Sequence, residues 1–454
     1  MNRKHMVRLA ATSVAAASLI AAAGCSSGTR VGEENPTPAE GQDGTGEVTG
    51  SVRAAWWGSA PRHEVTNAVF DLFEEANDGV TVEREFADFG AHFERLNVQA
   101  SSGNMPCLPQ LQGRQLNDYT TRDLLLPLDP MIESGAIDVS DIPAEVLDTG
   151  RGLDGELYMI PYGAAYDALL VNESVAEEIG VGLPPEGYTW EDFFDWAAQA
   201  QAELPDGMNA LNLGGSRPNF LISYVAASGE SLFEGSELGF SQELLVEYWS
   251  QWEEARTEGV TITPEEDAEM PSAPDQNYVA QGRTLADTAP GNALVNAQAT
   301  LDGTGDGGAL TTVALPSGPA GSGNVLFTSG FGIAASCDNV PSAAAAIDFW
   351  ATDDEAAAVF ASNNGAVTNT SHLEEQLADS DMPELQAHSL ELYGQIAANE
   401  PPTVVYPPGY QAAFEDAYGR AYESIAFGGT DVQEAAEAFF TEVNASLADA
   451  AQEE

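Results

Sequence analysis

Few residues of this sequence are spaced for catalysis or for metal binding. Beyond the first 24 positions the only histidines are His63, His92, His372 and His388, and none lies in an HExxH or another metal-ligand spacing. The sequence contains neither a G-x-S-x-G nucleophile motif nor a P-loop. Carboxylates are so frequent that no pair stands out for glycoside hydrolysis. We therefore expect no catalytic residue, no metal and no cofactor.

One glycine-rich stretch, from Asp302 to Gly308, could suggest a calcium loop or a phosphate cradle. It lacks the ligand order of an EF-hand, and no apolar strand leads directly into it. Its composition predicts a hairpin or an interstrand turn. An extracellular hydrolase is an alternative that would need a nucleophile or paired carboxylates, and neither is evident.

Side chains suited to binding a polar ligand do occur. A sugar can stack its C–H face on an aromatic ring while amides and carboxylates bind its hydroxyls. Trp56 and Trp57 end an apolar stretch, and neighbouring residues of a strand point to opposite faces, so at most one of them faces a cleft. Two core tryptophans are the open alternative. Asp167 lies in the mainly apolar stretch PYGAAYDALL, where burial requires a partner, either a ligand hydroxyl, an arginine or a backbone N–H.

The elements that position these residues alternate between strand and helix. Val52 to Trp57 predicts a strand, residues 63–77 carry a helical apolar stripe, Val80 to Phe86 alternates as a strand, and Phe93 to Ala100 predicts another helix. This order favours an α/β sheet with parallel pairs. Thr189 is expected to cap a helix from Trp190 to Ala202. The chain ends in two expected helices at roughly 411–427 and 432–449.

Length and charge limit the possible functions. The 454 residues exceed one ordinary domain, so two lobes are expected. The chain has 72 acidic and 15 cationic residues, and three of the cations (Arg3, Lys4 and Arg8) precede residue 24, which leaves 12. This charge excludes nucleic acid as a partner, because phosphate contacts need Lys and Arg. It indicates a halophilic protein, whose self-repulsion salt would screen.

The N-terminus predicts a secretory signal followed by a lipid anchor. Leu9 to Ala23 is apolar and uncharged, and it is shorter than the ~20 residues of a membrane span. The small residues before Cys25 resemble a lipobox, although Ala22 stands where Leu is usual. Cleavage after Ala23 is the alternative. The segment 25–51 is rich in Gly, Pro, Thr and Glu and predicts a flexible linker.

A resemblance to a known family covers almost everything from Val52 onward. The segments AAWWGSAPRHEVTNAVFDLFEEANDGVTVEREF, LLLPLDPMIESGAIDVSDIP, GELYMIPYGAAYDALLVNESVAEEIGV and FGIAASCDNVPSAAAAIDFWATDDEAAAVF resemble, in order, extracellular solute-binding proteins of sugar ABC importers, the group that includes maltose-binding protein. The resemblance implies an α/β, two-lobe periplasmic-binding-protein-like fold with three crossovers and a central cleft. It places a signal peptide at 1–24, the first lobe at 52–161 plus 330–366, and the second at 162–329 plus 367–454.

The same resemblance implies a function. The protein would be an extracytoplasmic, lipid-anchored monomer, without enzymatic activity, that captures a carbohydrate between its lobes and delivers it to the permease subunits of an ABC transporter. The alternatives that keep the fold are a polyamine, a peptide or a phosphate ester as cargo. Gln112 stands where the family commonly has Asp, and the family's aromatic residue near Pro290 is missing.

The residues that align with the family's ligand contacts form a longer set. The expected ligand-binding residues are Trp57, Ser59, Arg62, Gln112, Tyr166, Asp167, Asn219, Asn292, Ser329, Phe331 and Tyr410. Some relatives also carry cysteines in the segments of Cys107 and Cys337, which implies a disulfide between them. Two unrelated buried thiols are the alternative.

Overall fold

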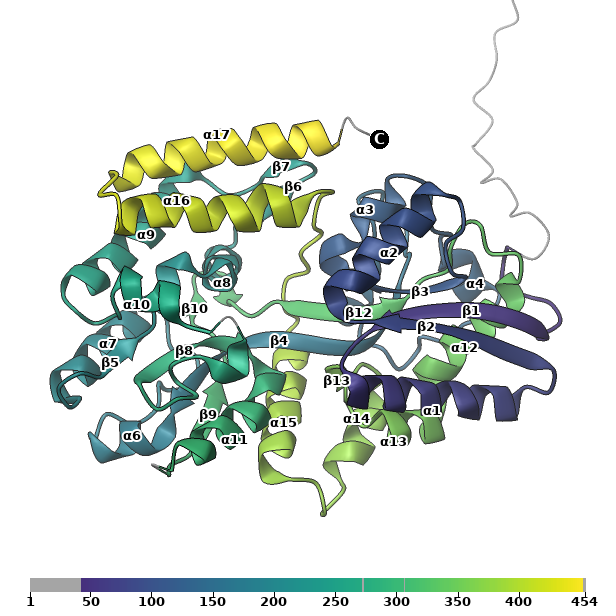
Figure 1. Ribbon diagram of the computed structural model, residues 1–454, viewed down its shortest axis with the longest axis horizontal. Coiled ribbons are helices and arrows are strands. Elements are labelled where there is room, and N and C mark those ends of the chain that lie inside the picture. Colours follow the sequence, from purple (N-terminus) through teal and green to yellow (C-terminus); the bar gives the residue numbers. More distant parts are fainter. Residues whose placement is uncertain (1–41, 272, 306, 452–454) are drawn as a thin grey trace, which may run out of the picture. The chain divides into compact units, whose positions relative to one another are not determined.

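The computed structural model describes residues 42–271, 273–305 and 307–451 (Figure 1). These residues fall within one compact unit, Pro38–Glu454. The expected signal peptide, Cys25 and most of the linker lie outside the described residues. No described helix combines the length and the apolar character that crossing a bilayer requires.

A nine-stranded sheet organises the described chain. Its main path runs β2-β1-β3-β12-β4-β8-β5, and β9 and β13 also pair with β4. The strands are β1 (Gly50–Trp57), β2 (Val80–Ala87), β3 (Leu108–Gln112), β4 (Ile160–Asn172), β5 (Asn209–Leu211), β8 (Thr284–Pro290), β9 (Leu310–Val313), β12 (Leu326–Phe331) and β13 (Ala366–Val367). The expected parallel pairing is confirmed for β1 with β2 and β3, and β5 is parallel to β8.

Two strands connect the parallel groups. The 13 residues of β4 pair antiparallel with β12 near their start and with β8 and β9 near their end. In Figure 1, β4 and β12 run through the middle, between β1 and β2 at the right and β8 and β5 at the left. All but one residue of β4 are buried, as expected of a central strand that is covered on both faces.

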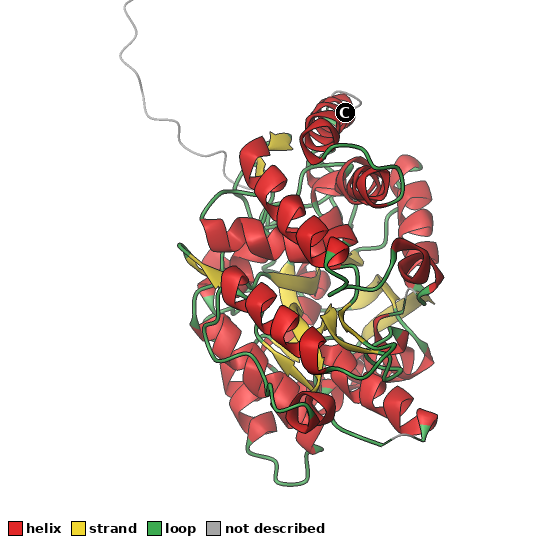
Figure 2. Cartoon of the chain, turned by 90° about the vertical axis from the view of Figure 1, so that its left-hand side faces the viewer, coloured by secondary structure: helices red, strands yellow, loops and turns green. Residues whose placement is uncertain are grey.

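Helices pack around these strands (Figure 2). The longer helices are α1 (Ala60–Ala76), α2 (Phe89–Ser101), α7 (Trp190–Glu203), α8 (Pro218–Ser228), α9 (Gln242–Thr257), α11 (Leu294–Thr304), α12 (Val340–Thr352), α14 (Thr370–Leu377), α15 (Glu384–Ala398), α16 (Asp416–Ala426) and α17 (Val432–Ala450). Shorter ones are α3 (Asn117–Thr120), α4 (Asp129–Glu133), α5 (Ala144–Leu147), α6 (Glu173–Glu178), α10 (Pro264–Glu269) and α13 (Asp354–Phe360). Small hairpins are β6 (Phe233–Glu234) with β7 (Glu237–Leu238), and β10 (Ser317–Gly318) with β11 (Gly321–Ser322).

Local sequence signals explain where several helices begin and end. The Thr189 side chain and Asp192 form a complete capping box at the start of α7, as predicted. The expected helix from residue 411 begins instead as a π-helical turn, η6 (Gln411–Glu415), and continues as α16. The glycine-rich stretch was predicted wrongly as a turn or hairpin. Asp302 to Thr304 complete α11, and Gly305, at a φ of 83°, ends it in the left-handed conformation that glycine favours.

Two large hydrophobic cores lie on either side of β4 and β12. One contains Trp56 and Phe70, and the other contains Trp249 and Trp252. Leu373 of α14 and Tyr393 of α15 belong to the core that contains Trp56, although the sequence borders place both helices in the second lobe. The lobe borders stay a prediction.

A disulfide joins two segments at one end of the sheet. Cys107 directly precedes β3, and Cys337 follows β12, the strand that pairs with β3. The two sulfur atoms are bonded, and the Cα atoms are 4.7 Å apart.

Candidate functional site

The tryptophan pair at the end of β1 is buried on both faces of the sheet. Trp56 packs against Phe70 and Phe86, with ring centroids 5.6 and 5.3 Å apart. Trp57 is only 5% exposed, and its ring lies against Phe89 and against two further side chains of α2. α2 covers the Trp57 ring in this structure, and the expected stacking of a sugar on Trp57 stays a prediction.

Ser59 and Arg62 occupy the start of α1. Ser59 is exposed, and as N-cap residue it makes no side-chain capping bond. Arg62 donates from Nη2 to the backbone oxygen of Asn363, at 3.3 Å, and no described carboxylate forms a salt bridge with it. Burial lowers the pKa of its guanidinium. Ser59 is thus open to solvent at the carboxyl end of β1, whereas Arg62 is half-buried and bonded to the backbone of Asn363.

The end of β3 carries an arginine that the sequence did not single out. Gln112 ends β3, and Arg114 follows in the 3-10 turn η1 (Gly113–Gln115). Arg114 donates from Nη1 to Glu415 Oε1 at 3.2 Å and from Nη2 to Asn219 Oδ1 at 3.4 Å. Its guanidinium lies over the ring of Phe327, 4.1 Å from the centroid. Arg114 thus joins the end of β3 to residues of α8 and η6.

Asp167 is the buried carboxylate of the same region. It is 4% exposed, and its Oδ2 has no hydrogen-bond partner among the described residues. Burial raises the pKa of this carboxyl to about 6, although the charge of Arg114 and the amide of Asn219 pull it down. A buried carboxylate oxygen without a partner is costly, and a ligand hydroxyl that donates to it would lower that cost.

Tyr410 completes the group that surrounds Arg114. Its buried hydroxyl donates to Glu415 Oε1 at 3.0 Å. Arg114, Asp167, Asn219, Tyr410 and Glu415 are called the Arg114 cluster below. Three of these residues were expected from the sequence, and Arg114 and Glu415 were missed.

Several other predicted ligand contacts are core residues. Tyr166 is 3% exposed, and its hydroxyl donates to the backbone oxygen of Ser389 at 2.7 Å. Tyr166 and Asp167 are neighbours on β4 and point to opposite faces, so the prediction that both reach a ligand is wrong for Tyr166. Phe331 is also buried, and its ring stacks on Tyr162 at a centroid distance of 5.2 Å.

The remaining predicted residues lie near strand ends. Ser329 pairs with Gln112 across β12 and β3, and Gln112 and Arg114 both line a small cavity of about 10 Å³. Asn292 is exposed in the 3-10 turn η5 (Gly291–Ala293) after β8. Asn292 lies two residues after Pro290, which pairs with Asp167 across β8 and β4.

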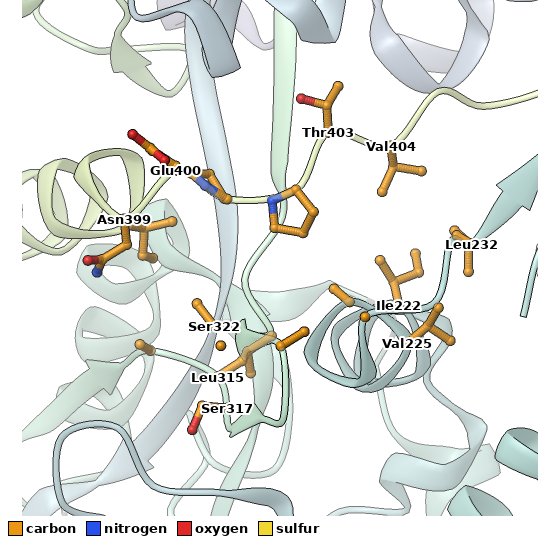
Figure 3. A pocket seen from close by; sticks show the side chains of 18 of the residues that line it. Ile222, Val225, Leu232, Leu315, Ser317, Ser322, Asn399, Glu400, Thr403 and Val404 are labelled. Atoms are coloured by element: carbon orange, nitrogen blue, oxygen red, sulfur yellow. The ribbon is translucent and has the colours of Figure 1, made fainter.

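A large cavity lies among other residues. It has a volume of about 1310 Å³ and is walled by α8, the β10–β11 hairpin, the end of α15 and residues 399–405. In Figure 3, Ile222, Val225 and Leu232 lie on one side, and Thr403 and Val404 lie across from them on the overlying segment. None of the predicted ligand residues lines this cavity.

The Arg114 cluster and this cavity differ in the polar groups that they hold. The cavity is lined by aliphatic side chains such as Ile222, Val225 and Leu232 and by polar ones such as Ser317, Asn399 and Glu400 (Figure 3). The cluster has buried hydrogen-bonding atoms without partners among the described residues, on Arg114 (Nε) and Asp167 (Oδ2). Ligand sites need a few converging polar groups, and a large volume alone does not supply them. Among the described residues no group of His, Cys, Asp and Glu is arranged to hold a metal.

Comparison with known proteins identifies the fold and the family of this chain. Residues 68–387 match the family model of the bacterial extracellular solute-binding proteins. A family 1 extracellular solute-binding protein from Alicyclobacillus acidocaldarius is 22% identical, with a TM-score of 0.72 over 89% of this chain and 100% of that one. The GacH receptor of Streptomyces glaucescens, solved unliganded and with acarbose, is 19% identical, with a TM-score of 0.67 over 89% and 100%.

A third solved structure has the same fold. It is a periplasmic oligogalacturonide-binding protein from Yersinia enterocolitica, 18% identical, with a TM-score of 0.73 over 88% of this chain and 100% of that one. These likenesses establish the two-lobe α/β fold of periplasmic binding proteins. The family model spans 320 of the 454 residues, from 68 to 387. The chain therefore belongs to the bacterial extracellular solute-binding protein family.

Proposed function

We propose that this protein captures a carbohydrate at the Arg114 cluster and delivers it, unchanged, to the permease of an ABC importer. The observation that carries the proposal is Asp167 Oδ2, a buried carboxylate oxygen without a described partner. A ligand hydroxyl that donates to this oxygen would relieve the cost of its burial.

The charges of the cluster distinguish a sugar from the other cargos. Arg114 lies beside two carboxylates, Asp167 and Glu415, and its positive charge offsets part of their negative charge. The guanidinium of Arg114 would repel a polyamine, and both carboxylates would repel a phosphate ester. A sugar hydroxyl both donates and accepts, so it can use the donor and the acceptors together.

The comparisons support the same class of cargo. The GacH receptor was solved with acarbose, and the Yersinia protein binds an oligogalacturonide, so both similar proteins have carbohydrate ligands. Binding without turnover suits the family. A ligand shifts such a protein to its closed form because the ligand binds that form more tightly than the open form. We further propose that Cys25 anchors the protein to the membrane by lipid. The Cys25→Ala variant is then expected in the medium, and a variant that still sediments with membranes contradicts the anchor.

A thermal-shift screen of the purified protein tests the cargo. The probes are neutral and acidic mono- and oligosaccharides, spermidine, short peptides and sugar phosphates. We expect a carbohydrate to raise Tm through binding to the folded state and to be recovered intact. A shift with spermidine or a peptide alone contradicts the carbohydrate proposal, and conversion of any probe contradicts the absence of enzymatic activity.

A further inference from the structure

The proposed carbohydrate site is closed to solvent in this structure. Asp167 is 4% exposed, and both Asp167 Oδ2 and Arg114 Nε are buried. The small cavity that Arg114 lines has a volume of about 10 Å³, which is room for about one water molecule. A carbohydrate needs far more space, since ligand pockets have volumes of about 300 Å³ and above. The segments that close the site must therefore separate before a sugar can reach Asp167.

Two neighbouring residues of α3 hold one of these segments in place. Asn117 Nδ2 donates to the backbone oxygen of Tyr406 at 2.8 Å, and Asp118 Oδ1 accepts from the backbone nitrogen of Gly409 at 2.8 Å. Asn117 is 1% exposed, and its Oδ1 accepts from Leu153 N at 3.1 Å. This bond fixes the orientation of the amide, so its nitrogen is held facing Tyr406.

The two bonds join separate hydrophobic cores. Leu116 and Tyr119, on either side of the pair in α3, pack in a core with residues of α2, whereas Tyr406 packs in the core that contains Trp249. In Figure 1 the chain between α15 and α16 runs across the middle of the molecule, past β4 and β12. This chain continues into η6, which carries Glu415 of the Arg114 cluster. The two bonds thus tie together, without any ligand, the two sides between which a sugar would bind.

We propose that Asn117 and Asp118 form a latch that holds the empty site shut and that the cargo must displace. The inference rests on the proposed function, because the cargo is the carbohydrate that binds Asp167. Only the unlatched fraction of the protein can bind, so the apparent dissociation constant is the intrinsic one divided by that fraction. A sugar that separates the two sides breaks the latch bonds, so these bonds stabilise the free protein and not the complex.

Binding kinetics of a latch variant test this proposal. Stopped-flow measurements with maltose, xylobiose and digalacturonate compare each variant with the parent protein. Asp118→Ala removes the acceptor of Gly409 N, and the loss of this hydrogen bond should raise the association rate and lower the dissociation constant about 3- to 10-fold. The dissociation rate should stay within about twofold of the parent value, because the latch is already broken in the complex. Asp118→Asn keeps an acceptor oxygen and should restore the parent rates.

A second variant and a control exclude a general loss of structure as the cause. Asn117→Asp keeps the oxygen that accepts from Leu153 N, but in its ionised form it cannot donate to Tyr406 O. It should therefore change the rates as Asp118→Ala does. Asp348→Ala removes a similar bond, from Asp138 N at 2.7 Å, between α12 and the segment before α5. This variant is the matched control and should change neither rate.

Small-angle X-ray scattering without ligand distinguishes failure of the latch from failure of the proposed function. The radius of gyration of the ligand-free double variant, Asn117→Asp with Asp118→Ala, should exceed that of the parent protein and of Asp348→Ala. Equal radii, or weaker carbohydrate binding by Asp118→Ala, overturn the latch and leave the proposed function intact. If no carbohydrate binds the parent protein, the proposed function fails, and the scattering still decides whether these bonds hold the two sides together.

Discussion

Two buried carboxylates on neighbouring strands have opposite surroundings. Asp287 of β8 accepts from Asn212 Nδ2 at 2.7 Å and from its neighbour Thr288 N at 2.8 Å, so both of its oxygens are bonded. Asp167 of β4 is equally buried, but its Oδ2 has no described partner. Burial raises the pKa of both carboxyls. Asp287 is thus satisfied within the fold, whereas Asp167 is the carboxyl at which we propose that the ligand binds.

The arginines beside these carboxylates differ in the same way. Arg217 forms a salt bridge with Asp267 at 2.5 Å and lies near Asp287, and all three residues belong to one group of elements around β5 and β8. Arg114 instead leaves β3 and contacts residues of α8 and η6. An arginine that links separate parts of the chain can respond to a ligand that binds between them.

Removing Asp287 should produce the largest effect. Asp287→Ala leaves Asn212 Nδ2 and the charge of Arg217 without their buried acceptor. The free energy of unfolding should fall by about 3–5 kcal/mol, whereas Asp167→Ala should lower it by less than about 1.5 kcal/mol. Urea unfolding measures both. Equal decreases in the free energy of unfolding would contradict the proposed difference between Asp287 and Asp167.

The free energy of unfolding should depend on pH through the ionisation of Asp167. Burial raises its pKa to about 6 from the ordinary value of 3.8, so the folded chain holds this proton more tightly than the unfolded chain. The stability that this group contributes is therefore full below pH ~4 and is lost as pH rises through ~6, by at most about 3 kcal/mol. Asp167→Asn should remove that slope between pH 4 and 7. Parallel pH profiles for the parent and the variant would refute the assignment.

Substitution of Asp167 and of Asp287 should have different effects on the affinity for carbohydrate. Asp167→Asn removes an ionised acceptor worth about 1.5–3 kcal/mol, so the dissociation constant should rise about 10- to 150-fold. Asp287→Asn is the matched control and should leave the affinity within about twofold. Calorimetry at pH 7.5 measures both constants. A larger loss in the Asp287 variant would place the cargo at the other carboxylate.

The smallest effect concerns two tyrosine hydroxyls. Tyr410→Phe removes the hydrogen bond to Glu415, and the free energy of carbohydrate binding should become less favourable by about 1 kcal/mol. Tyr418→Phe removes a bond to the backbone oxygen of Gly215, which should lower the free energy of unfolding by a similar amount without changing affinity. Calorimetry and urea unfolding of both variants compare them. A loss of affinity in the Tyr418 variant alone would contradict the placement of the site.

The sequence predicted much of the fold because its signals are local. Apolar periodicity located β1, α1, β2 and α2, and the capping box located the start of α7. The α11 terminus was missed because glycines that end a helix look the same in sequence as glycines that form a turn. The lobe affiliation of α14 and α15 depends on packing between residues distant in the chain, which no local signal encodes.

The site was predicted only in part, for reasons specific to its residues. Asp167 could be found because a lone carboxylate in an apolar strand demands a partner. The alternation that separated Trp56 from Trp57 applies equally to Tyr166 and Asp167, and it would have assigned Tyr166 to the core. Glu415 is one of 72 acidic residues, so neither type nor spacing distinguishes it, and its contact with Arg114 arises only in the fold.

A crystal structure with the bound carbohydrate tests the central claim most directly. We expect a sugar hydroxyl within about 2.5–2.7 Å of Asp167 Oδ2, with Arg114 bonded to the same sugar. The account is contradicted if the sugar instead occupies the ~1310 Å³ cavity beneath residues 399–405 and Asp167 Oδ2 still lacks a partner.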